Sequence, residues 1–231
     1  MKTFIIGDIH GCSGQFDELL NMLSPDPDID RIVLLGDLFD RGPSSWEVFQ
    51  RVKELEMHYK DRFVLIRGNH EDFLLRQRLS LMERLVWDRV GRQATVRSFA
   101  MHGEKMEGSA PWIDAHSVLF WKGEGYTCVH AGLRISPPEL NDAETMMHDH
   151  GIVLENSYNG PLIVTGHIAL EAPSWFAGDG ETIEQPEEET WHPLPEHGAL
   201  CIDAGCGKGG RLIGMTVENG KYILKGTGPS Q

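Results

Sequence analysis

The chain has 231 residues, 40% hydrophobic and 24% charged, which is the composition of an ordinary folded protein and excludes a disordered or fibrous chain. Its formal net charge of −14 would repel a polyphosphate backbone, so we expect no nucleic acid partner. No apolar run reaches the roughly 18 residues of a membrane span, and the first run ends too early for a signal peptide, so we expect a cytoplasmic protein with no membrane partner.

Short apolar runs recur along the chain, and glycine and polar residues end each of them. They predict strands at 3–6, 31–35, 63–66, 126–129, 162–165 and 200–202. Between the early runs, helical spacing places two sets of apolar residues on single faces: Phe16, Leu19, Leu20 and Leu23, and then Val48, Val52 and Leu55. This alternation predicts an α/β fold, in which ligands gather at the carboxyl ends of the strands.

Two later segments depart from the alternation. Residues 211–217 and 222–224 predict a hairpin, because the Asn219-Gly220 sequence between them favours a type I′ turn. Residues 171–197 contain four prolines and an acidic run, and we expect an exposed loop or insertion there, within a single domain that spans residues 1–231. A solvated linker is the simpler interpretation of this loop, and a lid over a site is the alternative.

Polar side chains lie at five of the predicted strand ends, and at four of them they follow a glycine. The sequences are GDIHG at 7–11, GDLFDRG at 36–42, GNHE at 68–71, VHAGL at 129–133 and TGH at 165–167. An Asp and a His two residues apart on an extended backbone point the same way and can share a metal ion. Strand ends require turn formers but not imidazoles, so the repeated placement indicates one shared site.

These five motifs, in this order, resemble the signature of the phosphoprotein phosphatase family of calcineurin-like metallophosphoesterases. Within that family, the chain resembles the prokaryotic serine/threonine protein phosphatase type. The resemblance implies a β-sandwich flanked by helices, in four layers α/β/β/α. The segments 202–205 and 209–212 resemble the closing strands of the family.

The resemblance also implies a centre of two divalent metal ions. Its ligands, in chain order, would be Asp8, His10, Asp37, Asn69, His130 and His167. The first two would hold one ion, the last three would hold the other, and the third would bridge them. Mixed carboxylate, amide and imidazole ligands suit manganese best, with iron or zinc as alternatives. Two such ions would acidify a shared water, and we expect the bridging hydroxide to attack phosphorus directly, without a covalent phosphoenzyme.

In the family, the position of His70 is that of the general acid, and Asp40 would orient its ring and raise its pKa. Arg41 and Asn69 would contact the phosphate of the substrate, Arg41 through its planar fork. A second phosphate-binding arginine that is usual in the family is missing from residues 146–150, so we expect Arg134 to replace it, and the alternative is that the substrate is held differently. A further metal site in the Met-Met-His-Asp-His sequence of residues 146–150 is not expected.

The leading hypothesis is a phosphomonoesterase of the serine/threonine protein phosphatase kind, acting on a phosphorylated protein or peptide or on a small phosphoester. The alternative is a symmetrical bis(5′-nucleosyl)-tetraphosphatase or another dinucleoside polyphosphate hydrolase, because these enzymes look like close relatives with the same motifs. A third hypothesis is a binding module that recognises phosphate without hydrolysing it, and only the missing arginine supports it. The metal ligands do not separate these hypotheses, because substrate choice depends on loops beyond them.

Overall fold

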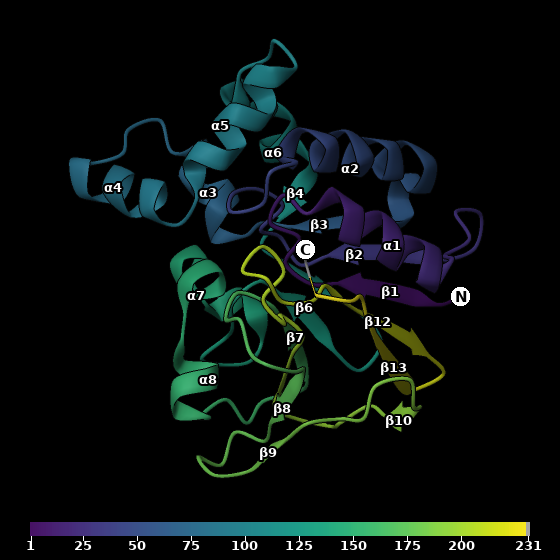
Figure 1. Ribbon diagram of the computed structural model, residues 1–231. Helices are drawn as coiled ribbons and strands as arrows, with labels where there is room; N and C mark the ends of the chain where they lie inside the picture. Colours follow the sequence, from purple (N-terminus) through teal and green to yellow (C-terminus); the bar gives the residue numbers. More distant parts are fainter. Residues whose placement is uncertain (230–231) are drawn as a thin grey trace.

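The computed structural model describes residues 1–229 and contains two β-sheets that face each other, with helices outside them (Figure 1). The strands of the first sheet are β1 (Thr3–Ile6), β2 (Arg31–Leu34), β3 (Phe63–Ile66), β4 (Ser117–Val118), β10 (His192–Pro193), β12 (Ile213–Glu218) and β13 (Lys221–Gly226). Their order is β10-β13-β12-β1-β2-β3-β4. The strands from β1 to β4 are parallel, and β12 joins β1 antiparallel.

The second sheet is shorter and is also mixed. Its strands are β5 (Phe120–Lys122), β6 (Thr127–Val129), β7 (Ile163–Thr165), β8 (Ser174–Phe176), β9 (Ile183–Glu184) and β11 (Ala199–Cys201). They lie in the order β5-β6-β7-β11-β8-β9, with β6, β7 and β11 parallel at the centre. All six strands predicted from the apolar runs are therefore present, each within one residue of its expected ends.

Eight α-helices are present in the described residues. They are α1 (Ser13–Leu23), α2 (Ser45–Tyr59), α3 (Asn69–Leu75), α4 (Leu81–Arg89), α5 (Arg92–Met101), α6 (Ala110–His116), α7 (Ala143–His148) and α8 (Gly151–Glu155), with 3₁₀ turns at Lys60–Arg62, Met106–Ser109 and Pro138–Leu140. Both predicted helical faces are confirmed, since the apolar residues at 16, 19, 20 and 23 and at 48, 52 and 55 are buried. No helix in residues 1–229 is long and apolar enough to cross a membrane.

Three hydrophobic clusters separate the layers. One joins the outer face of the first sheet to α1 and α2 and contains Phe16, Val48 and Ile32. The second lies between the sheets, where Ile5 of β1 and Val164 of β7 belong to the same cluster. The third covers the other face of the second sheet, beside α7 and α8. Helix, sheet, sheet and helix thus form successive layers, which confirms the predicted four-layer fold.

The predicted hairpin is β12 and β13, and its turn residues Asn219 and Gly220 both have positive φ, 50° and 71°, as a type I′ turn requires. Residues 171–197 hold three of the shortest strands, β8 to β10, and most of their side chains are exposed or half-buried. This segment leaves the second sheet after β9 and reaches the edge of the first sheet at β10.

Helices α4 and α5 form a hairpin that projects from the body, with α4 at the far left of Figure 1. A capping box begins α4, because the Glu83 amide donates to Ser80 Oγ and the Ser80 amide donates to Glu83 Oε2. Gly91 turns the chain into α5 with a φ of 113°, and its carbonyl accepts the Arg41 amide. The hairpin is therefore tied to the loop that follows β2.

Candidate active site

The predicted metal ligands meet where strand ends of the two sheets converge, and Asp37 lies at their centre. Its Oδ2 is 3.5 Å from His10 Nε2, and its Oδ1 is 3.4 Å from His130 Nε2. Asp37 belongs both to a possible metal-binding group with His10 and His70 and to a second group with His130 and His167. It thus has the position expected of a bridging ligand.

The other predicted ligands complete the two groups. Asp8 Oδ2 is 4.0 Å from His10 Nε2. Asn69 Oδ1 is 3.0 Å from His130 Nε2 and also 3.0 Å from His167 Nδ1. Asp8, His10, Asp37 and Asn69 follow strands of the first sheet, whereas His130 and His167 follow strands of the second. The structure therefore brings together all six predicted ligands, and it does so from both sheets.

The backbone at these strand ends is locally strained. His10, Asp37 and His167 have positive φ values of 46°, 50° and 69°, a region that residues with a Cβ rarely adopt. Two motif glycines are required by close approach, since an added Cβ at Gly68 would collide with Asp37 Oδ1 and one at Gly166 would collide with Asp8 Oδ1. The glycines of the motifs thus allow the ligand side chains to lie directly against neighbouring backbone.

Hydrogen bonds fix the ring orientation of two of the histidines. His10 Nδ1 is 2.8 Å from the Phe39 carbonyl, and His130 Nδ1 is 2.8 Å from the Leu35 carbonyl. A carbonyl can only accept, so each Nδ1 carries the proton, and Nε2 is left with a free lone pair in the neutral ring. That tautomer presents Nε2 as a metal ligand.

Burial controls the charges of the ligands. It lowers the pKa of His10, His130 and His167, to about 2 for His167, so these rings are neutral. Burial, with the neighbouring carboxyl of Asp203 and then that of Asp37, raises the pKa of Asp8 well above its usual value. Burial alone would also raise the pKa of Asp37, but the neighbouring histidines, among them His70, whose own pKa is raised, outweigh it and hold the pKa of Asp37 below its usual range.

The site fits divalent metal ions on its own chemistry. Asp8 Oδ1 and His167 Nε2 are buried and have no hydrogen-bond partner in residues 1–229. A buried polar atom left without a partner costs about 1–3 kcal/mol, and ligation of an ion would remove that cost. Oxygen and imidazole donors that share one carboxylate are also a suitable set for a dinuclear centre.

The proposed acid pair is present beside the ligands. His70 Nδ1 is 2.5 Å from Asp40 Oδ2, and His70 Nε2 lies 3.8 Å from Asp37 Oδ2. Burial acts to lower the pKa of His70, but the Asp37 and Asp40 carboxylates outweigh it and raise that pKa. The guanidinium of Arg41 lies against His10 Nε2, at the centre of the predicted site.

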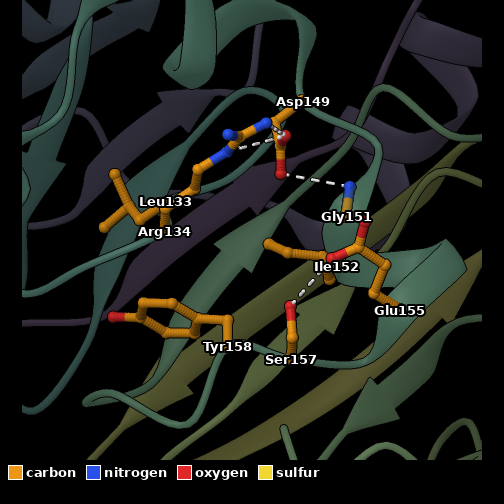
Figure 2. A pocket seen from close by; sticks show the side chains of 8 residues that line it. All are labelled: Leu133, Arg134, Asp149, Gly151, Ile152, Glu155, Ser157 and Tyr158. Atoms are coloured by element: carbon orange, nitrogen blue, oxygen red, sulfur yellow. Dashed lines mark hydrogen bonds and ion pairs between the residues drawn. The ribbon is translucent and has the colours of Figure 1, made fainter.

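Arg134 lies apart from the predicted ligands. Its guanidinium donates to Asp149 Oδ1 at 2.9 Å, its side chain is 73% exposed, and none of its contacts in residues 1–229 reaches a predicted metal ligand. Figure 2 shows this pair on one side of a cavity of about 210 Å³, with Ser157 and Tyr158 on the other. His150 lies in the chain between two residues that line the cavity, Asp149 and Gly151, and its ring centroid is 4.8 Å from that of His167.

Sequence reasoning did not give a role to several residues that contact the site. Glu71 accepts hydrogen bonds from the amides of Asp37 and Leu38, although it is the last residue of the GNHE motif. Asp203 follows a predicted strand directly, and the predicted ligands share this position. Its Oδ2 is buried and has no hydrogen-bond partner within the described chain. Trp87 and Thr95, which bind Asp40, lie on helices and follow no strand.

Comparison with known proteins gives one consistent result. The model of the calcineurin-like phosphoesterase family matches residues 1–197. A symmetrical bis(5′-nucleosyl)-tetraphosphatase of Coxiella burnetii is 33% identical over 149 residues, which are 64% of this chain but only 46% of that relative.

Two solved structures share the fold across the whole chain. A metallophosphoesterase from Sphaerobacter thermophilus has a TM-score of 0.65 at 16% identity, covering 100% of this chain and 90% of its own. A serine/threonine phosphatase from Saccharomyces cerevisiae has a TM-score of 0.57 at 14% identity, covering 100% of this chain and 81% of its own. With the family model matching most of its length and the ligand geometry in place, the chain belongs to the calcineurin-like phosphoesterase family.

Proposed function

We propose that this phosphoesterase hydrolyses dinucleoside polyphosphates of the symmetrical bis(5′-nucleosyl)-tetraphosphate kind, with two divalent ions, manganese before iron or zinc. The observation that carries metal-dependent phosphoester hydrolysis is the sharing of Asp37 by two possible metal-binding groups next to the His70–Asp40 pair, whereas the choice of substrate has separate support. Asp8 and His10 would hold one ion with Asp37, and Asn69, His130 and His167 would complete the site of the other. When bound, the ions supply positive charge to the phosphate and acidify the attacking water.

The remaining groups have separate tasks. Because Asp40 accepts the Nδ1 proton of His70, Nε2 faces the site and can donate its proton to the leaving oxygen. Arg41 would hold a non-bridging oxygen through its planar fork, and the Asn69 amide would hold another. Because water is the attacking nucleophile, no side chain has to attack phosphorus. These roles therefore require no covalent intermediate.

The choice of substrate rests on the relatives and on the cavity of Figure 2. Relatives that match 133 to 149 residues of this chain are named symmetrical tetraphosphatases, although the match covers less than half of their length. The leaving group of a dinucleoside tetraphosphate is itself a phosphate chain, so it needs positive charge beyond the metal site. Arg134 offers such a charge at the cavity, and His150, which lies between the lining residues Asp149 and Gly151, contacts the ring of His167.

The test compares substrates on one preparation reconstituted with Mn²⁺. Diadenosine tetraphosphate, a phosphoserine peptide and an aryl phosphate would be assayed for kcat/KM, and the nucleotide products would be separated. We expect the tetraphosphate to have the highest kcat/KM and to yield two molecules of ADP. AMP and ATP as products would contradict symmetrical cleavage. Metal-loaded protein that binds phosphate but hydrolyses none of the three would be a binding module.

A second candidate is the serine/threonine protein phosphatase, and the outer face of α4 favours it. Leu81, Met82, Leu85 and Val86 on this face are 47–74% exposed, and the next residue, Trp87, binds the catalytic Asp40. An apolar face so close to an active site suits a protein substrate. A higher kcat/KM for an intact phosphoprotein than for its short phosphopeptide and for the tetraphosphate would support this candidate.

A further inference from the structure

Asp40 is held by two side chains that lie outside the phosphoesterase motifs. The indole Nε1 of Trp87, from α4, donates to Asp40 Oδ2 at 2.6 Å, and the hydroxyl of Thr95, from α5, donates to Asp40 Oδ1 at 2.7 Å. Resting on the proposed function, we infer that Trp87 and Thr95 are positioning residues, which hold Asp40 and thereby aim the His70 proton at the leaving group.

The hydrogen bonds around Asp40 leave it little freedom to rotate. One carboxylate oxygen accepts from both His70 and Trp87, and the other accepts from Thr95. Thr95 also accepts the backbone amide of Asp40 at 2.8 Å, so its hydroxyl contacts both the backbone and the side chain of that residue. Ser45 Oγ lies 3.0 Å from the same hydroxyl and completes its bonding.

Asp40 requires these hydrogen bonds because its backbone is strained and its side chain is shielded from water. Asp40 has a φ of 71°, a left-handed conformation that is unfavourable for a residue with a Cβ and that neighbouring contacts must maintain. Asp40, His70 and Thr95 are all almost fully buried, so no bulk water can replace a lost hydrogen bond. Loss of one donor therefore lets the carboxylate turn and changes the direction of the His70 ring.

The identity of the donors matters as well as their number. The indole N–H can only donate, and it does not titrate in the range of protein chemistry. Trp87 and Thr95 therefore both donate hydrogen bonds to the Asp40 oxygens. His70 Nδ1 donates to the same carboxyl group, and in the protonated ring the second proton lies on Nε2, facing the site.

The hydrogen bonds of Trp87 and Thr95 can be removed by substitutions that preserve the surrounding packing. Trp87 stacks on Phe73, with ring centroids 5.7 Å apart, and Arg92 lies over the indole at 5.0 Å. Trp87→Phe keeps an aromatic ring in this stack and removes the N–H. Thr95→Val keeps the shape and removes the hydroxyl, whereas Thr95→Ser restores it.

The experiment measures kcat for aryl phosphates whose leaving phenols differ in acidity. A poor leaving group needs a proton from His70, whereas a nitro-substituted phenolate leaves without one. We expect Trp87→Phe and Thr95→Val to lower kcat about tenfold or more for phenyl phosphate and less than about twofold for 2,4-dinitrophenyl phosphate. Thr95→Ser should behave as the wild type does.

The control is Trp46→Phe, because Trp46 packs on Phe99 of α5 at 5.2 Å and does not contact the acid pair. This variant should not change the dependence on the leaving group. In a His70→Asn background, Trp87→Phe should cause no further loss, since the proton donor is already absent. Metal content and the midpoint of urea unfolding would be measured for every variant.

Equal slowing of all substrates, or no slowing, would overturn the role of Trp87 and Thr95. If Trp87→Phe does not fold, the comparison of Thr95→Val with Thr95→Ser decides whether the hydrogen bond to Asp40 matters, since both side chains are close to threonine in shape. Failure of the proposed function is a separate result, in which the wild type hydrolyses aryl phosphates but not diadenosine tetraphosphate. The inference about the acid pair survives that result.

Discussion

The Glu71 carboxylate accepts a hydrogen bond from the backbone amide of Asp37 at 2.8 Å, beneath the residue shared by both groups of metal ligands. The same carboxylate accepts from the amides of Leu38 and Gly68, at 2.9 and 3.1 Å. Asp37 has a φ of 50°, so Glu71 stabilises a strained turn at the centre of the site. Glu71 is thus a structural support for the bridging ligand.

Glu71→Gln should destabilise the metal-free protein by about 1–3 kcal/mol, because the amide nitrogen of glutamine cannot accept and leaves a buried backbone N–H without a partner. Burial raises the pKa of Glu71 to about 7, so unfolding in urea should be measured above that pH, where the carboxylate is ionised. Glu144→Gln, at an exposed position on α7, is the control and should have a much smaller effect. Equal unfolding midpoints for both variants would contradict the role of Glu71.

His70→Asn should lower kcat for diadenosine tetraphosphate by about a hundredfold or more, as expected for loss of a proton donor. The metal content, measured by inductively coupled plasma mass spectrometry, should stay near that of the wild type, because the six predicted ligands remain. A variant that lost its ions would show instead that His70, which lies in the first group with His10 and Asp37, is a ligand.

Metal affinity should rise with pH, and binding should release protons. Burial, with Asp203 and Asp37, raises the pKa of Asp8, so its carboxyl keeps a proton that an ion must displace. His10, His130 and His167 have lowered pKa values and are already neutral, so they release none. For the same reason, the free energy of unfolding of the metal-free protein should fall as pH rises through the raised pKa of Asp8.

Calorimetric titration with Mn²⁺ in two buffers of different ionisation enthalpy would count the released protons. The count should fall as pH rises, because more of the Asp8 carboxyl has then ionised before the ion binds. Asp8→Asn should lose most of this release. Binding without proton release over the whole pH range of the titration would show that Asp8 is already ionised in the metal-free protein.

Arg134→Ala should raise KM for diadenosine tetraphosphate about tenfold and leave kcat unchanged, if its guanidinium binds a distal phosphate. Asp149→Asn should have the opposite effect on KM, because it removes the carboxylate that now holds Arg134. Arg97→Ala, at an exposed position on α5, is the matched control. An unchanged KM in Arg134→Ala would remove Arg134 from substrate binding.

The sequence was most informative where one local pattern determines both the fold and the chemistry. A buried parallel strand such as β1 is a continuous apolar run, and the residues after it must lie at the edge where ligands bind. Asp8, His10 and Asp37 could therefore be placed before their neighbours were known. The same rule would have found Asp203, which follows the predicted strand 200–202 directly and lies two residues after the end of β11.

Other parts of the fold and of the site could not be predicted from a local sequence pattern. Helix α4 leaves Leu81 and Leu85 exposed, so its apolar residues do not fall on one inward face, and it could not be predicted from periodicity. Strands such as β9 and β10 have two residues each, and their existence depends on pairing with distant partners. Trp87 reaches Asp40 across 47 residues of chain, a contact that only the folded structure defines.

The origin of the ligands in both sheets has a consequence for folding. Asn69 meets His130 and His167 across 61 and 98 residues of chain, and Asn69 follows one sheet while the two histidines follow the other. An ion held by all three would act as a non-covalent cross-link between the halves of the sandwich, and it could bind only after the sheets had docked. Such an ion stabilises the docked state by mass action, so chelation should loosen the contact between the sheets before it disturbs either sheet.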